Sequence, residues 1–222
     1  HSESVFCQEA KPPPVPPRHL FLPADAPLDS PLTIVMAGDA SGNHEQFSYA
    51  TAILPVGPTD TPLVRHMPYP STGARPVLAH RARTTMAECS TDGEALVFGD
   101  FFRTCAYHHN PGSLYTDSLS CVTRLESVRA TLGVTPSVCR IICSSARPIW
   151  RGVARRLTEM GPDLADRITV SHVKAHQDRT TAHADLDFAA TLNVFADAEA
   201  ELAHHEDAPS WSLQHASFPP DE

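Results

Sequence analysis

The sequence lacks the features that mark membrane and secreted proteins. It has no apolar run long enough to cross a bilayer and no basic-then-apolar leader. Its six cysteines form no CxxC pair and no secretory framework, so we expect reduced residues in a protein core. No internal repeat is apparent. These absences predict an intracellular protein without membrane contact.

A net positive charge is also missing. The formal net charge is -9 at pH 7, which argues against a protein that holds nucleic acid through bulk charge. The 13 histidines raise the question of zinc. His172 and His176 share one face of a predicted strand, but they would lie about 13 Å apart, too far for one ion. A structural zinc site is therefore not expected.

Proline marks the ends of the chain. Eight of the 21 prolines fall in residues 1–31, which predicts a linker or an extended arm. Residues 204–222 show no hydrophobic periodicity and predict a tail. Residues 32–203 can bury one good core. We expect one domain, monomeric in isolation, cut from a larger polyprotein.

Two acids follow apolar segments. Residues 32–38 are mostly apolar and lead into Asp39 and then small residues, which predicts a buried strand with Asp39 near its end. Residues 114–118 repeat the pattern with Asp117, and Ser118 is placed to cap a following helix. Adjacent strands that end in acids would put two carboxylates side by side. For either acid alone, a turn-forming aspartate is the simpler explanation.

Glu94 opens an amphipathic stripe on a predicted helix and should face inward like the apolar residues after it. Alone, it would also complete a capping box with Thr91. Glu88 is a rival for the same role, but we prefer Glu94 because Asp92, four residues after Glu88, breaks the apolar stripe. The apolar members of the stripe are Val97, Phe98, Phe101, Phe102 and Cys105.

A second helix carries Asp197, with Asn193 one turn before it. The preceding segment, residues 168–176, predicts a strand whose last residue, His176, leans over the same cleft. Singly, Asp197 could be a solvated helix acid and His176 a loop histidine. One site is favoured because all these residues occur together, in one order. The predicted buried stripe of this helix is Phe188, Leu192, Phe195 and Leu202.

Four clustered carboxylates predict a divalent metal centre. Hydrolysis of a phosphodiester needs an activated water and a stabilised leaving oxygen, and two Mg²⁺ ions about 4 Å apart can provide both. Mg²⁺ prefers oxygen ligands and keeps several waters. Without a metal the acids would repel one another and raise some of their own pKa values. The pattern therefore indicates a metal-dependent nuclease.

The same residues resemble a known family, the ribonuclease H domains, and within it those attached to reverse transcriptases of retroelements and retroviruses. One departure is Ala40, where a Gly is common in the family. Another is the long, proline-rich interval between Asp39 and Glu94, which predicts a hairpin with an expanded loop. The resembling segments are residues 38–41, 91–96, 115–118, 172–176 and 193–197.

The resemblance implies an α/β fold with a mixed five-stranded sheet and helices on both faces. It also implies cleavage of the RNA strand of RNA/DNA hybrids by two Mg²⁺ ions, or Mn²⁺ in their place, beside a reverse transcriptase domain of the same polyprotein. His176 matches the mobile histidine thought to assist product release or proton transfer. Three residues of the matched motifs, Ser41, Ser118 and Asn193, are expected to contact substrate. The matched metal-binding carboxylates are Asp39, Glu94, Asp117 and Asp197.

A basic stretch predicts a surface for the substrate. Six of the 17 Lys and Arg residues fall in the acid-free stretch 127–158, together with Trp150. Arg and Trp in one patch favour clamping of a phosphate backbone and stacking. A solvated face of a helix over residues 148–160 is the alternative. The predicted phosphate contacts are Arg147, Arg151 and Arg155.

Two other functions are compatible with this fold. One is a DNA-processing enzyme such as an integrase, transposase or resolvase. Such enzymes typically lack the block of His176, Asn193 and Asp197 near the C-terminus, so this block counts against them. The other is a noncatalytic module that serves as a spacer or binding platform. Loss of an acid would mark such a module, and none is lost.

Overall fold

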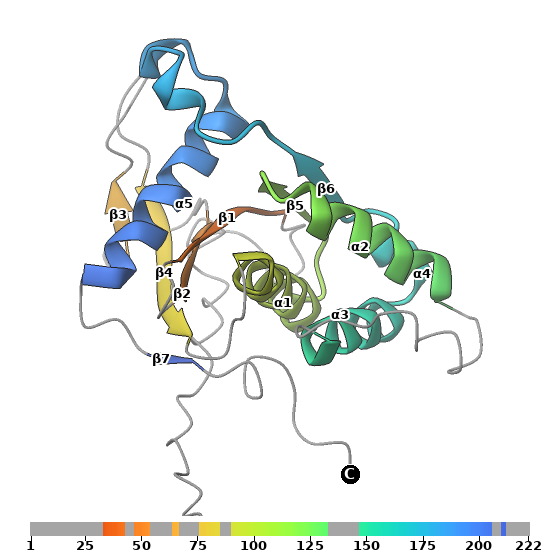
Figure 1. Cartoon of the computed structure of the whole chain (residues 1–222). Helices are drawn as coiled ribbons and strands as arrows, with labels where there is room; N and C mark the ends of the chain where they lie inside the picture. Colours follow the sequence, from red (N-terminus) through yellow and green to blue (C-terminus); the bar gives the residue numbers. More distant parts are fainter. Residues whose placement is uncertain are drawn as a thin grey trace, which may run out of the picture.

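One mixed β-sheet forms the centre of the protein, and helices pack on both of its faces (Figure 1). The computed structural model describes residues 33–42, 47–53, 64–66, 76–84, 90–132, 147–205 and 210–211. The predicted arm over residues 1–31 and the rival acid Glu88 lie outside these ranges.

Among the described residues, the sheet has seven strands in the order β3-β4-β2-β1-β5-β6, with β7 paired to β4. β1, β5 and β6 are parallel, whereas β1, β2, β4 and β3 pair antiparallel. The prediction of five strands is therefore wrong in number, because two short strands, β3 and β7, both add to β4. The strands are β1 (Ile34–Gly42), β2 (Phe47–Ile53), β3 (Val64–His66), β4 (Pro76–Thr84), β5 (Gly112–Thr116), β6 (Thr169–His172) and β7 (Ser210–Trp211).

The helices form layers on the two faces of this sheet (Figure 1). On one face, Ile34 and Met36 of β1 share a core with α1, and α3 packs on α1. On the other face, Val35 and Ala37 pack with α5. This alternation follows from the two-residue period of a strand. The helices are α1 (Ser90–His108), α2 (Leu119–Thr131), α3 (Arg147–Met160), α4 (Pro162–Ala165) and α5 (Phe188–His205).

The apolar stripe predicted after Glu94 is confirmed, because all five of its members lie on α1 and are buried in the hydrophobic core. The close approach of α1 to β1 depends on Gly38. A Cβ at this position would overlap Cγ1 of Val97 and lie 2.8 Å from its Cγ2. The absence of a side chain at Gly38 therefore sets the distance between the strand that carries Asp39 and the helix that carries Glu94.

The stripe predicted on α5 is partly wrong. Leu192 and Phe195 are buried, but Phe188 and Leu202 are 40% and 41% exposed. The buried apolar positions that follow Phe195 are alanines, while Glu199 is a buried acid among them, and Leu202 falls outside the stripe. No helix in the described part of the chain is both long and apolar enough to span a membrane. The alanines are Ala196, Ala200 and Ala203.

Candidate metal centre

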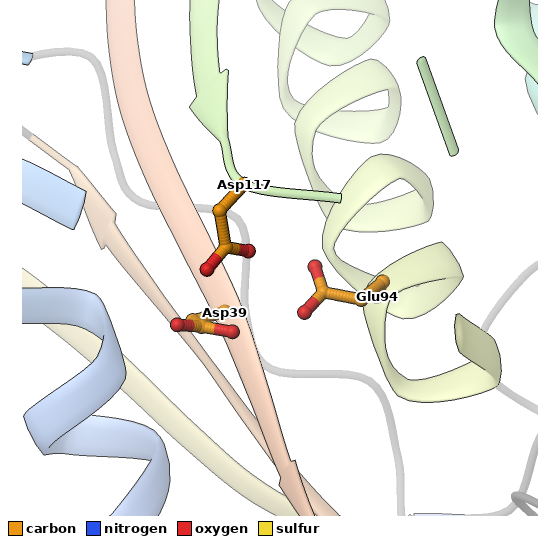
Figure 2. A group of neighbouring side chains, drawn as sticks. All are labelled: Asp39, Glu94 and Asp117. Atoms are coloured by element: carbon orange, nitrogen blue, oxygen red, sulfur yellow. The ribbon is translucent and has the colours of Figure 1, made fainter. Parts of the chain in front are cut away.

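Three carboxylates from three different elements meet at one point (Figure 2). Asp39 lies on β1, Glu94 lies in the second turn of α1, and Asp117 directly follows β5. Each offers one carboxylate oxygen, and these three oxygens lie within 4.8 Å of one another. Asp39 and Glu94 are buried, and Asp117 is half-buried.

Asp39 and Asp117 come together through the parallel pairing of β1 and β5. The register pairs Ala37 with Tyr115, and each acid lies two residues further along its chain. Asp39 is not near the end of its strand as predicted, because β1 stays paired with β2 as far as Gly42. On its other side, β1 loses its neighbour at this level, since β5 ends at Thr116. The end of the neighbouring strand therefore opens the sheet beside Asp39.

Glu94 turns toward β1 instead of capping its own helix. Its Oε1 accepts the N–H of Ala40 at 3.1 Å, and the same N–H lies 2.7 Å from Oδ1 of Asp39. Its Oε2 is buried and has no hydrogen-bond partner within the described residues. Glu94 therefore does not form the capping box that was the alternative.

The donor set of this site fits a divalent cation. A buried carboxylate oxygen without a partner is costly in a folded protein, and a cation would satisfy it. Hard cations such as Mg²⁺ and Mn²⁺ take oxygen ligands of this kind. Asp39, Glu94 and Asp117 are therefore the residues that could hold such an ion.

Burial and mutual repulsion raise the pKa values of all three acids. Burial raises the pKa of Asp39 to about 7, and the charges of Asp117 and Asp197 act in the same direction. Burial and the neighbouring Asp39 hold the pKa of Glu94 well above its ordinary value. The pKa of Asp117 is raised by burial and then by Asp197, whereas His176 lowers it. The cluster thus disfavours its own negative charge, and a cation would relieve that cost.

Asp197 and His176 form a pair at the border of this cluster. Nδ1 of His176 lies 3.1 Å from Oδ2 of Asp197, and both side chains are partly exposed. Asp197 is not one of the three acids grouped within 4.8 Å, but its charge raises the pKa of two of them. It therefore flanks the centre.

The sequence predicts that His176 ends a strand, and this prediction is wrong. β6 stops at His172, and His176 adopts a left-handed conformation (φ 47°) before a short 3₁₀ turn over Gln177–Arg179. The strand cannot continue because its partner β5 ends at Thr116, whose carbonyl accepts the last pairing N–H, from Val173, at 2.8 Å. A loop therefore brings His176 to Asp197.

The three predicted substrate-contacting residues have different environments. Ser41 is half-buried in β1. Ser118 occupies the N-cap position of α2, but its side chain makes no cap hydrogen bond, and its Oγ lies 3.3 Å from Oγ of Ser120. Asn193 is only 2% exposed, one turn before Asp197, and its Oδ1 has no partner among the described residues.

The predicted basic helix exists as α3, which begins at Arg147. Arg151 is exposed on it, whereas Arg155 lies 3.4 Å from Glu159 in an ion pair. Trp150 does not offer a stacking surface, since it is 2% exposed and its ring centroid lies 5.3 Å from that of Phe98. This contact places the start of α3 beside the half of α1 that carries Glu94.

The protein resembles known proteins in structure, but its sequence finds no match. The sequence matches no protein-family model and no curated protein. The solved RNase H domain of PFV is similar to it at 15% identity and a TM-score of 0.51, covering 79% of this chain and 96% of that domain. RNase H1 of Halobacterium salinarum NRC-1 gives 12% identity and a TM-score of 0.41, over 78% of this chain and 98% of that one. The likeness to the PFV domain shows that the chain has an RNase H-like fold.

Proposed function

We propose that this protein is a metal-dependent endoribonuclease that hydrolyses the RNA strand of RNA/DNA hybrids. One observation carries the proposal. On an RNase H-like fold, oxygens of Asp39, Glu94 and Asp117 lie within 4.8 Å of one another, and a buried oxygen of Glu94 lacks a partner among the described residues. Such a cluster fits oxygen-ligated divalent ions.

In this proposal the acids hold two Mg²⁺ ions, or two Mn²⁺ ions. When bound, the ions would supply an activated water and stabilise the leaving oxygen of the phosphodiester. Asp39 and Asp117 would fix the ligand geometry, because one lies in a strand and the other directly follows one. Glu94 and Asp197 would flank them from helices. His176, oriented by Asp197, would move a proton or assist release of the product.

The substrate is proposed from the chemistry of the surface. Hybrids are recognised largely by their shape and by their 2′-hydroxyl groups, so a local patch suffices despite the net charge of -9. Arg147, Arg151 and Arg155 would contact phosphates from α3. Ser41, Ser118 and Asn193 would contact the strand near the acids. The resemblance of the motifs further favours a domain of an intracellular retroelement polyprotein, next to its reverse transcriptase.

Cleavage of three labelled duplexes tests this function. RNA/DNA, RNA/RNA and DNA/DNA are incubated with Mg²⁺, with Mn²⁺ and with a chelator, for the wild type and for Asp117→Asn. The control is Asp163→Asn, which makes the same chemical change at an exposed acid of α4. We expect metal-dependent cleavage of only the RNA strand of the hybrid, retained in the control and lost in Asp117→Asn.

Other outcomes would each contradict the proposal in a distinct way. Cleavage of DNA/DNA would assign the chain to the DNA-processing enzymes with this fold. Binding of the hybrid without cleavage, under both metals, would indicate a noncatalytic module. Full activity of Asp117→Asn would remove the acid cluster from the site.

A further inference from the structure

His172, the last residue of β6, lies against the main chain of Asp117. Its Nε2 is 3.1 Å from the carbonyl oxygen of Asp117. A carbonyl oxygen can only accept a hydrogen bond, so this ring nitrogen must be the donor. The contact joins two segments that are 55 residues apart in the sequence.

No strand or helix fixes the position of the main chain at Asp117. β5 ends at Thr116 and α2 begins at Leu119, so Asp117 belongs to neither element. Within this turn, the N–H of Leu119 donates to the carbonyl of Asp117 at 3.1 Å, and the N–H of Ser118 donates to Oγ1 of Thr116, also at 3.1 Å. These bonds are local. The ring of His172 ties the same carbonyl to the neighbouring strand of the sheet.

His172 also affects the pKa of Asp117. It acts with His176 to lower the pKa of Asp117, against the effect of burial and of Asp197. The two histidines therefore approach one acid from the end of β6 and from the loop that follows it. They do so because the strand stops at His172, instead of extending to His176.

We propose that His172 is a positioning residue, which holds the carbonyl of Asp117 and thereby aims the Asp117 carboxylate at the bound cation. Metal ligands must be held within about 0.5 Å of a productive geometry. Partners that orient ligands typically contribute about 10- to 100-fold to metal affinity. The inference rests on the proposed function, because it assumes that Asp117 is a cation ligand.

Three substitutions separate the hydrogen bond from the ring. His172→Gln keeps an N–H donor close to the place of Nε2, whereas His172→Phe keeps a ring and removes the donor. His172→Ala also removes the donor and does not require a ring to fit. The matched control is Thr169→Val, which removes another side-chain bond between β6 and β5, from Thr169 Oγ1 to Ser113 Oγ at 2.9 Å.

The measurement is the Mg²⁺ concentration that equals the apparent dissociation constant, fitted to the rise in unfolding temperature over a Mg²⁺ titration, with the full chain and no nucleic acid. For His172→Phe and His172→Ala we expect this concentration to rise about tenfold or more. His172→Gln should stay within about threefold of the wild type. Thr169→Val should match the wild type. In cleavage of the hybrid, the donor-free variants should lose turnover at low Mg²⁺, regain it at high Mg²⁺ and keep the wild-type KM.

Three results would overturn the inference. One is a wild-type Mg²⁺ response in both donor-free variants, and another is a defect in His172→Gln as large as theirs. The third is an equal defect in Thr169→Val, which would indicate a general loss of sheet stability. A wild-type protein that responds to neither Mg²⁺ nor Mn²⁺ would contradict the proposed function itself, and the inference with it.

Discussion

Asp39 and Asp117 lie side by side because two parallel chain segments run in register. Ala37 pairs with Tyr115, and the same offset brings the two acids together two residues later. β1 continues past this level, whereas β5 ends at Thr116. Two carboxylates are thus placed by main-chain hydrogen bonding, and Glu94 joins them from α1.

Asp117→Asn should abolish activity without weakening the fold. Hydrolysis should fall at least about 100-fold, equivalent to about 2.7 kcal/mol of activation free energy. The unfolding temperature in chelator should stay the same or rise, because the change removes one charge from a cluster of acids that repel one another. Single-turnover cleavage and thermal unfolding measure the two effects. A large loss of stability would show that Asp117 is structural.

The raised pKa values predict how stability depends on pH. Asp39 has a pKa of about 7 in the folded protein and an ordinary value of 3.8 when unfolded. Between these values the folded state keeps a proton that the unfolded state has released. In chelator, this acid should therefore lower the free energy of unfolding as pH rises from about 4 to about 7. Glu94 should add to the effect, since its pKa is also raised.

Mg²⁺ should reverse this dependence. A cation competes with the protons on Asp39 and Glu94, so the rise in unfolding temperature with Mg²⁺ should be larger at about pH 8 than at about pH 5. Thermal unfolding with Mg²⁺ and with chelator checks this expectation. Asp39→Asn is the control and should show a smaller difference between the two pH values. An Mg²⁺ effect that does not change with pH would contradict the assignment.

Gly38→Ala should disturb the site through packing. The added Cβ would overlap Val97, so we expect a loss of about 1 to 3 kcal/mol in unfolding free energy. Activity should fall too, because α1 carries Glu94. Val97→Ala in the same chain should recover part of both losses.

The control for this packing prediction is Gly99→Ala, at a glycine within α1. There an added Cβ would lie 3.2 Å from Cγ2 of Ile149, so only a small shift of that side chain is needed. Chemical denaturation of the variants measures the difference. If Gly38→Ala were as stable and as active as Gly99→Ala, the close approach of α1 to β1 would not matter for the site.

Arg151→Ala should weaken binding of the hybrid and reduce its dependence on salt. The loss of one phosphate contact lowers the slope of log affinity against log salt by about 0.9. Metal binding should not change. The control is Arg167→Ala, since Arg167 is exposed and precedes β6 at the end of that strand away from His172. Equal slopes for Arg151→Ala and the wild type would remove α3 from the binding surface.

The acids and α1 could be predicted from the sequence because their signals are local. The apolar stripe after Glu94 has helical spacing, and all of its members are buried. Asp39 and Asp117 follow apolar segments, which identifies them as acids in a strand or directly after one. Their distance to each other depends on the pairing register of β1 and β5, which local patterns do not contain.

The errors came where partners far along the chain decide the structure. His176 looked like the end of a strand, but that strand stops when its partner β5 does. Trp150 looked like a surface aromatic among arginines, yet it packs on Phe98. The role of His172 could not be predicted, because its hydrogen bond crosses 55 residues and exists only once β5 and β6 are paired.

The chemistry of the new RNA ends tests the central claim most directly. If Asp39, Glu94 and Asp117 hold the ions that activate water, water adds across the broken P–O bond. Mass spectrometry of the fragments from a hybrid should then find linear phosphate and hydroxyl ends, formed with Mg²⁺, absent in chelator and absent with Asp39→Asn. Fragments that end in 2′,3′-cyclic phosphate, or that form in chelator, would contradict the claim, because the ribose 2′-hydroxyl would then be the attacking group.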